Sequence, residues 1–200
     1  MAVAAIGLNA QTPDDYATGF SADITTQTTL SDGTSSVRQS KVYYGKNKMR
    51  VDMINSADTG LKHGQGIGGM IYRMDQRVSW MLIPDKKTYI EMPIAAMPMN
   101  GAAPVNPLEM PDKKYIAAES VNGELANKYE VTMGNGDAAQ TLYVWIANKS
   151  MIPLRVETTT PGGSLTIEYT NVVPGEPAAE LFEIPSGYTK FEIKGIPRMH

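Results

Sequence analysis

The chain has 200 residues, a formal net charge of −3 and no cysteine. This length fits one domain with a sizeable core, and the balanced charge supplies no basic surface, which argues against a nucleic acid partner. The lack of cysteine excludes disulfides, thiolate metal sites and cysteine nucleophiles.

The N-terminus reads MAVAAIGLNAQ, an apolar run that ends in small residues and turns polar at Gln11. It resembles the end of a secretory signal without its basic start. We predict that residues 1–10 are the remnant of an export signal, that residues 11–200 form a single domain, and that the protein is periplasmic or secreted. The alternative is that residues 1–10 are simply a first helix or strand. No other run reaches the roughly 18 to 20 apolar residues of a membrane-spanning helix, so we predict no transmembrane span.

Apolar and polar residues alternate along most of the chain, which is typical of half-buried strands. Pairs such as Asp32-Gly33 and Asn122-Gly123 predict the turns between them. The expected strands are 20–30, 36–44, 48–54, 70–75, 77–83, 86–92, 115–121, 125–133, 141–147, 154–160, 165–172 and a final stretch near 188–193.

Helical signals are few and short. They comprise a capped start at Thr12-Pro13, a single turn at 106–110 and another at 177–182. A flat open sheet of this many strands is unusual. The expected fold is therefore mainly β: one curved antiparallel sheet, a half-open barrel of about eleven strands, with short helices or loops covering the concave face.

Residues 92–111, MPIAAMPMNGAAPVNPLEMP, carry five prolines and a single charge, Glu109. Prolines at 98, 104 and 107 prevent a long regular helix. Both flanks belong to the predicted sheet, so this segment is not a linker between domains. We predict an apolar, methionine-bearing flap packed across the concave face.

Motifs that carry catalysis are weak. Residues 64–69 match GxGxxG, but a dinucleotide site also needs a strand before the motif and a helix after it. The two histidines are His63, in the same glycine-rich loop, and His200, the last residue, which gives neither a positioned base nor a zinc ligand set. The sequence therefore predicts a protein that is not an enzyme and that has no cofactor.

The methionines are more informative, because 13 of them occur in 200 residues. Met97-Pro98-Met99 offers two soft sulfurs to Cu(I), yet such sites usually repeat the motif or add histidine, so we assign no metal. Methionine also suits surfaces that adapt to variable apolar partners. The alternative is an ordinary core that uses methionine. The candidate ligand-binding residues are Met49, Met53, Met70, Tyr72, Met74, Trp80, Leu82, Met97 and Met99.

Trp145 and Tyr143 share one face of their predicted strand, opposite Leu142, Val144 and Ile146. One of these faces must belong to the core. The aromatic face, beside polar neighbours from the next strand, then suits a partly wet groove or an outer surface.

The order of the strands resembles the LolA/LolB-like superfamily of periplasmic lipoprotein carriers, and in particular an uncharacterised bacterial family of that fold. The resemblance covers about residues 20–193, and its most specific element is PAAELFEIPSGY at 177–188. The other stretches that carry it are FSADITTQTTL at 20–30, KVYYGKNKMRVDM at 41–53, MIYRMDQRVSWMLIPDKKTYIEMP at 70–93, KYEV at 128–131 and YVWIANKSMIPLRVE at 143–157.

The resemblance implies a half-open barrel whose concave apolar face is closed by helices or loops and holds acyl chains. The long amphipathic lid helices of a lipoprotein carrier are not visible in the sequence, and no carrier-specific residue is transferred to this chain.

The first functional hypothesis is an exported, non-enzymatic protein that binds an apolar ligand, such as an acyl chain, a lipid or a lipoprotein, and that touches the envelope only peripherally. The alternative is an interaction or structural module of the cell envelope whose core is filled and which holds no ligand. An unrecognised enzyme or metal site is the third.

Overall fold

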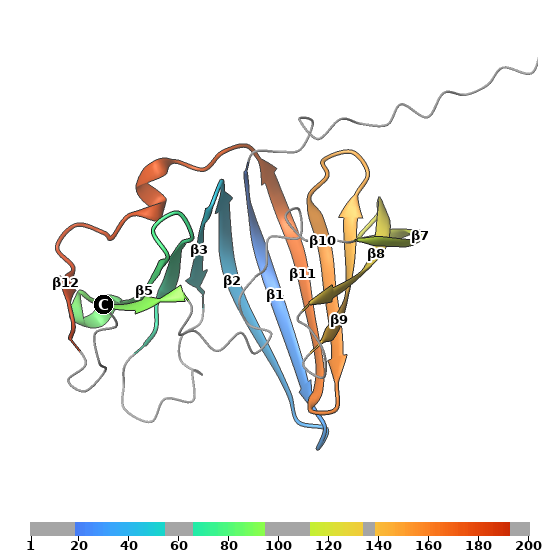
Figure 1. Cartoon of the computed structure of the whole chain (residues 1–200), viewed down its shortest axis with the longest axis horizontal. Coiled ribbons are helices and arrows are strands. Elements are labelled where there is room, and N and C mark those ends of the chain that lie inside the picture. The colour runs from blue at the N-terminus through green and yellow to red at the C-terminus, as the bar shows by residue number, and fades with distance from the viewer. Residues whose placement is uncertain (1–18, 55–65, 95–112, 134–138, 193–200) are drawn as a thin grey trace, which may run out of the picture.

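The computed structural model describes residues 19–54, 66–94, 113–133 and 139–192, and these form one open sheet that twists and curves along its length (Figure 1). Within these ranges there are twelve strands and two short 3-10 helices. In chain order they are β1 (Phe20–Leu30), β2 (Ser35–Gly45), β3 (Lys48–Met53), β4 (Gly69–Arg73), β5 (Val78–Ile83), η3 (Pro84–Lys86), β6 (Thr88–Pro93), β7 (Lys114–Val121), β8 (Glu124–Met133), β9 (Gln140–Ala147), β10 (Pro153–Thr160), β11 (Gly163–Pro174), η7 (Ala179–Phe182) and β12 (Thr189–Lys190).

The sheet consists of two meanders that meet in its middle. The strand order is β12-β6-β5-β4-β3-β2-β1-β11-β10-β9-β8-β7. Strands β1 to β6 follow one another on one side, and β7 to β11 follow one another on the other. The pairing of β1 with β11 joins the two meanders and brings Ile24 opposite Tyr169.

Turn residues account for the tight hairpins. Asn122 and Gly123 both have positive φ, 52° and 84°, as a two-residue hairpin turn requires. Asp32 accepts a hydrogen bond from the backbone N–H of Thr34 at 2.8 Å, which closes the β1–β2 turn. At Gly163 a Cβ atom would stand 2.1 Å from the carbonyl oxygen of Thr29, so the close approach of the β10–β11 turn to β1 requires glycine.

The two faces of the sheet carry different cores. The main apolar face bears one continuous cluster that runs from β4 through β1 to β8 and includes Phe20, Val42, Met49, Tyr72 and Val144. The opposite face bears two smaller clusters. One surrounds Trp145, and the other consists of Ile71, Trp80, Leu82 and Phe182.

The structure confirms the mainly β fold and the open, curved sheet, and it differs from the expectation at the end of the chain. The final strand is only Thr189–Lys190, and it pairs with β6 in parallel rather than antiparallel. The short turn predicted at 177–182 is confirmed as η7. Among the described residues, no helix is both long enough and apolar enough to span a membrane.

The predicted export remnant at 1–10, the helix start at Thr12, and the turn and flap within 92–111 lie wholly or mostly outside the described residues. The single domain over 11–200 also stays a prediction.

Candidate functional site

The candidate site is the part of the main apolar face that lies on β3 to β6. Residues directly opposite each other on neighbouring antiparallel strands point to the same face. The pairing therefore places two rows of side chains side by side across β2, β3, β4, β5 and β6. The first row is Tyr44, Met49, Tyr72, Ser79 and Met92, and the second is Val42, Val51, Met70, Met81 and Ile90.

Burial falls along the second row. Val42 is fully buried and Val51 is 6% exposed, whereas Met70, Met81 and Ile90 are partly exposed. Met53 on β3 and Met92 on β6 are also partly exposed. We call these partly exposed residues the methionine surface: Met53, Met70, Met81, Ile90 and Met92.

The methionine surface is electrically neutral. In the part of the chain that the structure describes, β3 to β6 direct their charged side chains, such as Arg50, Arg73 and Glu91, to the opposite face. Burial raises the pKa of Tyr72 to about 12, so its hydroxyl stays protonated. This hydroxyl donates a hydrogen bond to the sulfur of Met70 at 3.3 Å. The surface therefore offers apolar and polarizable contacts without an ionic anchor.

The structure brings four of the predicted ligand-binding residues together and separates three others from them. Met49, Met53, Met70 and Tyr72 share the main apolar face. Met74 lies in the turn after β4 and is 37% exposed.

The remaining predicted residues lie elsewhere. Trp80 and Leu82 belong to the opposite face, where they pack with Ile71 and Phe182. Met97 and Met99 lie outside the described residues.

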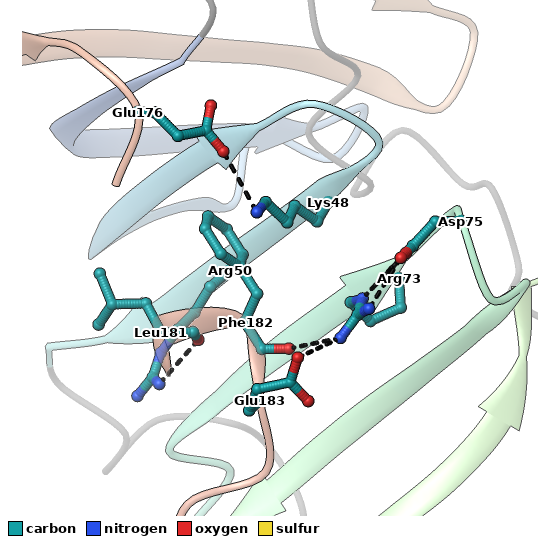
Figure 2. A network of polar contacts seen from close by, with 8 residues as sticks. All are labelled: Lys48, Arg50, Arg73, Asp75, Glu176, Leu181, Phe182 and Glu183. Carbon is teal, nitrogen blue, oxygen red and sulfur yellow. Dashed lines mark hydrogen bonds and ion pairs between the residues drawn. The ribbon is translucent and has the colours of Figure 1, made fainter. Parts of the chain in front are cut away.

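The C-terminal segment covers Trp80 and Leu82. Its η7 helix places Phe182 in this cluster with no exposed surface. Three cations of β3 and β4 hold the segment, as Figure 2 shows. Lys48 pairs with Glu176 at 3.2 Å and lies 4.8 Å from the centre of the Phe182 ring.

The two arginines bind the backbone of the same segment (Figure 2). Arg50 donates to the carbonyl oxygen of Leu181 at 3.1 Å. Arg73 donates to the carbonyl oxygen of Phe182 at 3.4 Å. It also donates to the carboxylates of Asp75 at 2.7 Å and Glu183 at 2.6 Å, and these carboxylates raise the pKa of its guanidinium. The opposite face of β3 and β4 is thus sealed by the chain itself.

Sequence reasoning omitted three members of the methionine surface, namely Met81, Ile90 and Met92. Apolar and polar residues alternate in their strands, and this alternation places Met81 on the opposite face from Trp80 and Leu82. The signal that identifies them is the pairing of Met81 with Met70 and with Ile90.

Trp145 forms a second aromatic site on the opposite face, near the other end of the sheet. Its ring is 3% exposed because Lys128 and Arg155 lie over it, 4.5 and 5.7 Å from the ring centre. Its indole N–H donates to Glu119 at 2.9 Å. These cations close the partly wet groove expected here, and the outer surface above the ring is charged.

Nothing in the described residues gathers three or more histidine or carboxylate side chains at metal-binding distance. Both histidines lie outside the described residues.

Comparison with known proteins gives matches at the level of structure. No protein-family model and no curated protein matches the chain. A LolA superfamily protein from Nitrosomonas europaea matches with 12% identity and a TM-score of 0.45, over 86% of this chain and 93% of that one.

Two further solved structures match with the same TM-score of 0.45. A DUF1329 family protein from Desulfovibrio piger is 14% identical over 84% of this chain and 91% of its own. A putative outer membrane lipoprotein-sorting protein domain from Vibrio parahaemolyticus is 12% identical over 81% and 87%. The superfamily that the sequence resembles is thus among the matched structures.

Proposed function

We propose that this chain is an exported, non-enzymatic binding protein that holds an apolar ligand, such as an acyl chain, a lipid or a lipoprotein, against the methionine surface. The observation that carries the proposal is the pair of cross-strand rows. These rows continue the core from Val42 and Tyr44 on β2 toward partly exposed methionines on β4 to β6. Among the described residues of β3 to β6, no charged side chain shares this face.

The driving force is removal of apolar area from water, roughly 25 cal/mol per Å². Methionine side chains are unbranched and polarizable, so they adjust to chains of different shape. An ionised group would lose its hydration against Met70, Met81 and Ile90 without gaining a counter-ion, so a polar head is expected to stay in water. Periplasmic or secreted localisation, with peripheral contact to the envelope, accompanies this proposal.

The test is ligand binding with a matched pair of variants. The purified protein is first extracted for lipid mass spectrometry, then delipidated and titrated with a fluorescent fatty acid. Met81→Asp places a carboxylate in the second row and is expected to weaken binding by at least about 10-fold. Met74→Asp changes the same residue type in the exposed turn and is expected to leave the affinity nearly unchanged.

A protein that is repeatedly empty after purification and takes up no fluorescent fatty acid would overturn the proposal. Equal losses in both aspartate variants would also overturn it, because binding would then not depend on the methionine surface.

A specific observation favours the alternative function, an envelope interaction module without a ligand. On β1, β2 and β9 the main apolar face is already filled by its own side chains, with Phe20, Val42 and Val144 fully buried. An empty protein whose Met81→Asp variant is as destabilised as a core variant would support this second function.

A further inference from the structure

The two edges of the sheet differ in whether the last long strand has a partner. At one edge β12 pairs with β6, and Lys190 binds Glu91 across them at 2.7 Å. At the other edge, the outer side of β7 has no strand beside it among the described residues. Tyr115 is 56% and Ile116 41% exposed on this strand. An open edge that exposes large apolar side chains can accept another strand.

The β7 sequence complements itself when reversed. It reads Lys114-Tyr115-Ile116-Ala117-Ala118-Glu119. In an antiparallel pair of two copies centred between Ile116 and Ala117, each lysine faces a glutamate, each tyrosine faces an alanine, and each isoleucine faces an alanine. Opposite charges and large-to-small contacts both stabilise cross-strand pairs.

A β-bulge makes this register geometrically consistent. Residues five positions apart in a regular strand point to opposite faces, but the pairing of β7 with β8 shifts between Tyr115 and Ala117 and leaves Ile116 as the extra residue. Lys114 and Glu119 therefore share one face, where Lys114 lies 3.4 Å from Glu130 and Glu119 lies 3.9 Å from Lys128.

We propose that β7 is an interface at which a second copy of this chain binds about a two-fold axis, so that the two sheets become continuous. Edge lysines usually oppose such pairing, but here each faces a carboxylate of the other copy. The side chains of Lys114 and Glu119 are 72% and 43% exposed, so both are accessible to a partner despite their contacts with β8. This assembly is independent of the proposed ligand.

The experiment is a charge exchange monitored by sedimentation velocity from nanomolar to high micromolar protein. The wild-type chain is expected to form dimers. Lys114→Glu and Glu119→Lys each place like charges opposite each other, twice per dimer, and are expected to weaken self-association by at least about 10-fold. An equimolar mixture of the two variants restores both attractive pairs and is expected to form a heterodimer.

Controls separate pairing from folding. Lys149→Glu reverses an exposed charge in the β9–β10 turn and is expected to leave dimerisation unchanged. Because Glu119 accepts the Trp145 N–H, its replacement changes the surroundings of Trp145 even in a folded chain, so far-UV circular dichroism and cooperative urea unfolding check that Glu119→Lys is folded. A wild-type chain that stays monomeric, variants that dimerise like wild type, or a mixture of folded variants that does not associate would each overturn the proposal.

Discussion

The two faces of strands β3 to β5 differ in how far they are covered by the rest of the chain. The face with Ile71 and Trp80 is sealed by Phe182 and by backbone contacts to Arg50 and Arg73. The face with Met70 and Met81 shares the same strands and the same pairing, yet these two methionines remain partly exposed. Contiguous apolar surface that stays exposed commonly marks a binding site.

The two faces also differ in the flexibility of their side chains. The sealed face uses Trp80, Ile71 and Phe182, which have few rotamers and hold one fixed arrangement. The methionine surface uses flexible side chains that tolerate several arrangements. The comparison therefore contrasts a face that the C-terminal segment holds in one arrangement with a methionine surface whose side chains can adapt.

The largest effect is expected on the sealed face. Phe182→Ala removes a fully buried ring and is expected to lower the free energy of unfolding by about 3–5 kcal/mol. Leu181→Ala, at the partly exposed neighbouring position, is the matched control and is expected to cost less than half as much. Urea unfolding followed by tryptophan fluorescence measures both. Similar, small losses in the two variants would contradict the assignment of Phe182 as the anchor of the C-terminal segment.

An intermediate effect is expected within the main apolar face. Met49 is 3% exposed between Tyr44 and Tyr72, so Met49→Ala should lower the free energy of unfolding of the delipidated protein by about 2–4 kcal/mol. Met81→Ala, on the same face but partly exposed, should cost about 1 kcal/mol or less. If Met81→Ala is as destabilising as Met49→Ala, the methionine surface is ordinary core and the contrast between the faces is lost.

The smallest effect is expected in the pH dependence of stability, through the Lys190–Glu91 pair that joins β12 to β6. Hydrogen bonds from Lys190 and Trp80 hold the pKa of Glu91 below its usual value of 4.5. A depressed folded-state pKa stabilises the native state above the unfolded pKa, and this contribution is lost as pH falls through the folded value. Thermal unfolding between neutral pH and pH 3 should therefore show a shallower acid loss for Glu91→Gln than for wild type. Identical slopes would mean that this pair does not contribute.

Much of the fold could be predicted from the sequence, because each strand carries its own alternation and each hairpin its own turn residues. Asn122-Gly123 and Asp32-Gly33 mark turns that the structure confirms. The short length and the parallel direction of β12 could not be predicted. Its pairing with β6 depends on where Phe182 anchors the preceding segment.

The candidate site could be predicted only in part. Alternation within one strand does not show which alternate residues of the next strand point to the same side of the sheet. The turn between Arg73 and Val78 contains four residues, and it places Met70 opposite Met81. Trp80 and Leu82 thereby fall on the other side from Tyr72, although all three have even numbers. A shift of one residue in register exchanges the faces, and turn length alone did not settle it.

The positions of β11 and β12 also determine when the sheet can form. The central strand β1 needs residues 163–174 as its neighbour, and β6 at the edge needs residues 189–190. Contacts so distant along the chain slow folding, since the intervening loop must be closed first. The N-terminal meander therefore lacks a neighbouring strand on both sides until residues 163–174 and 189–190 have been synthesised.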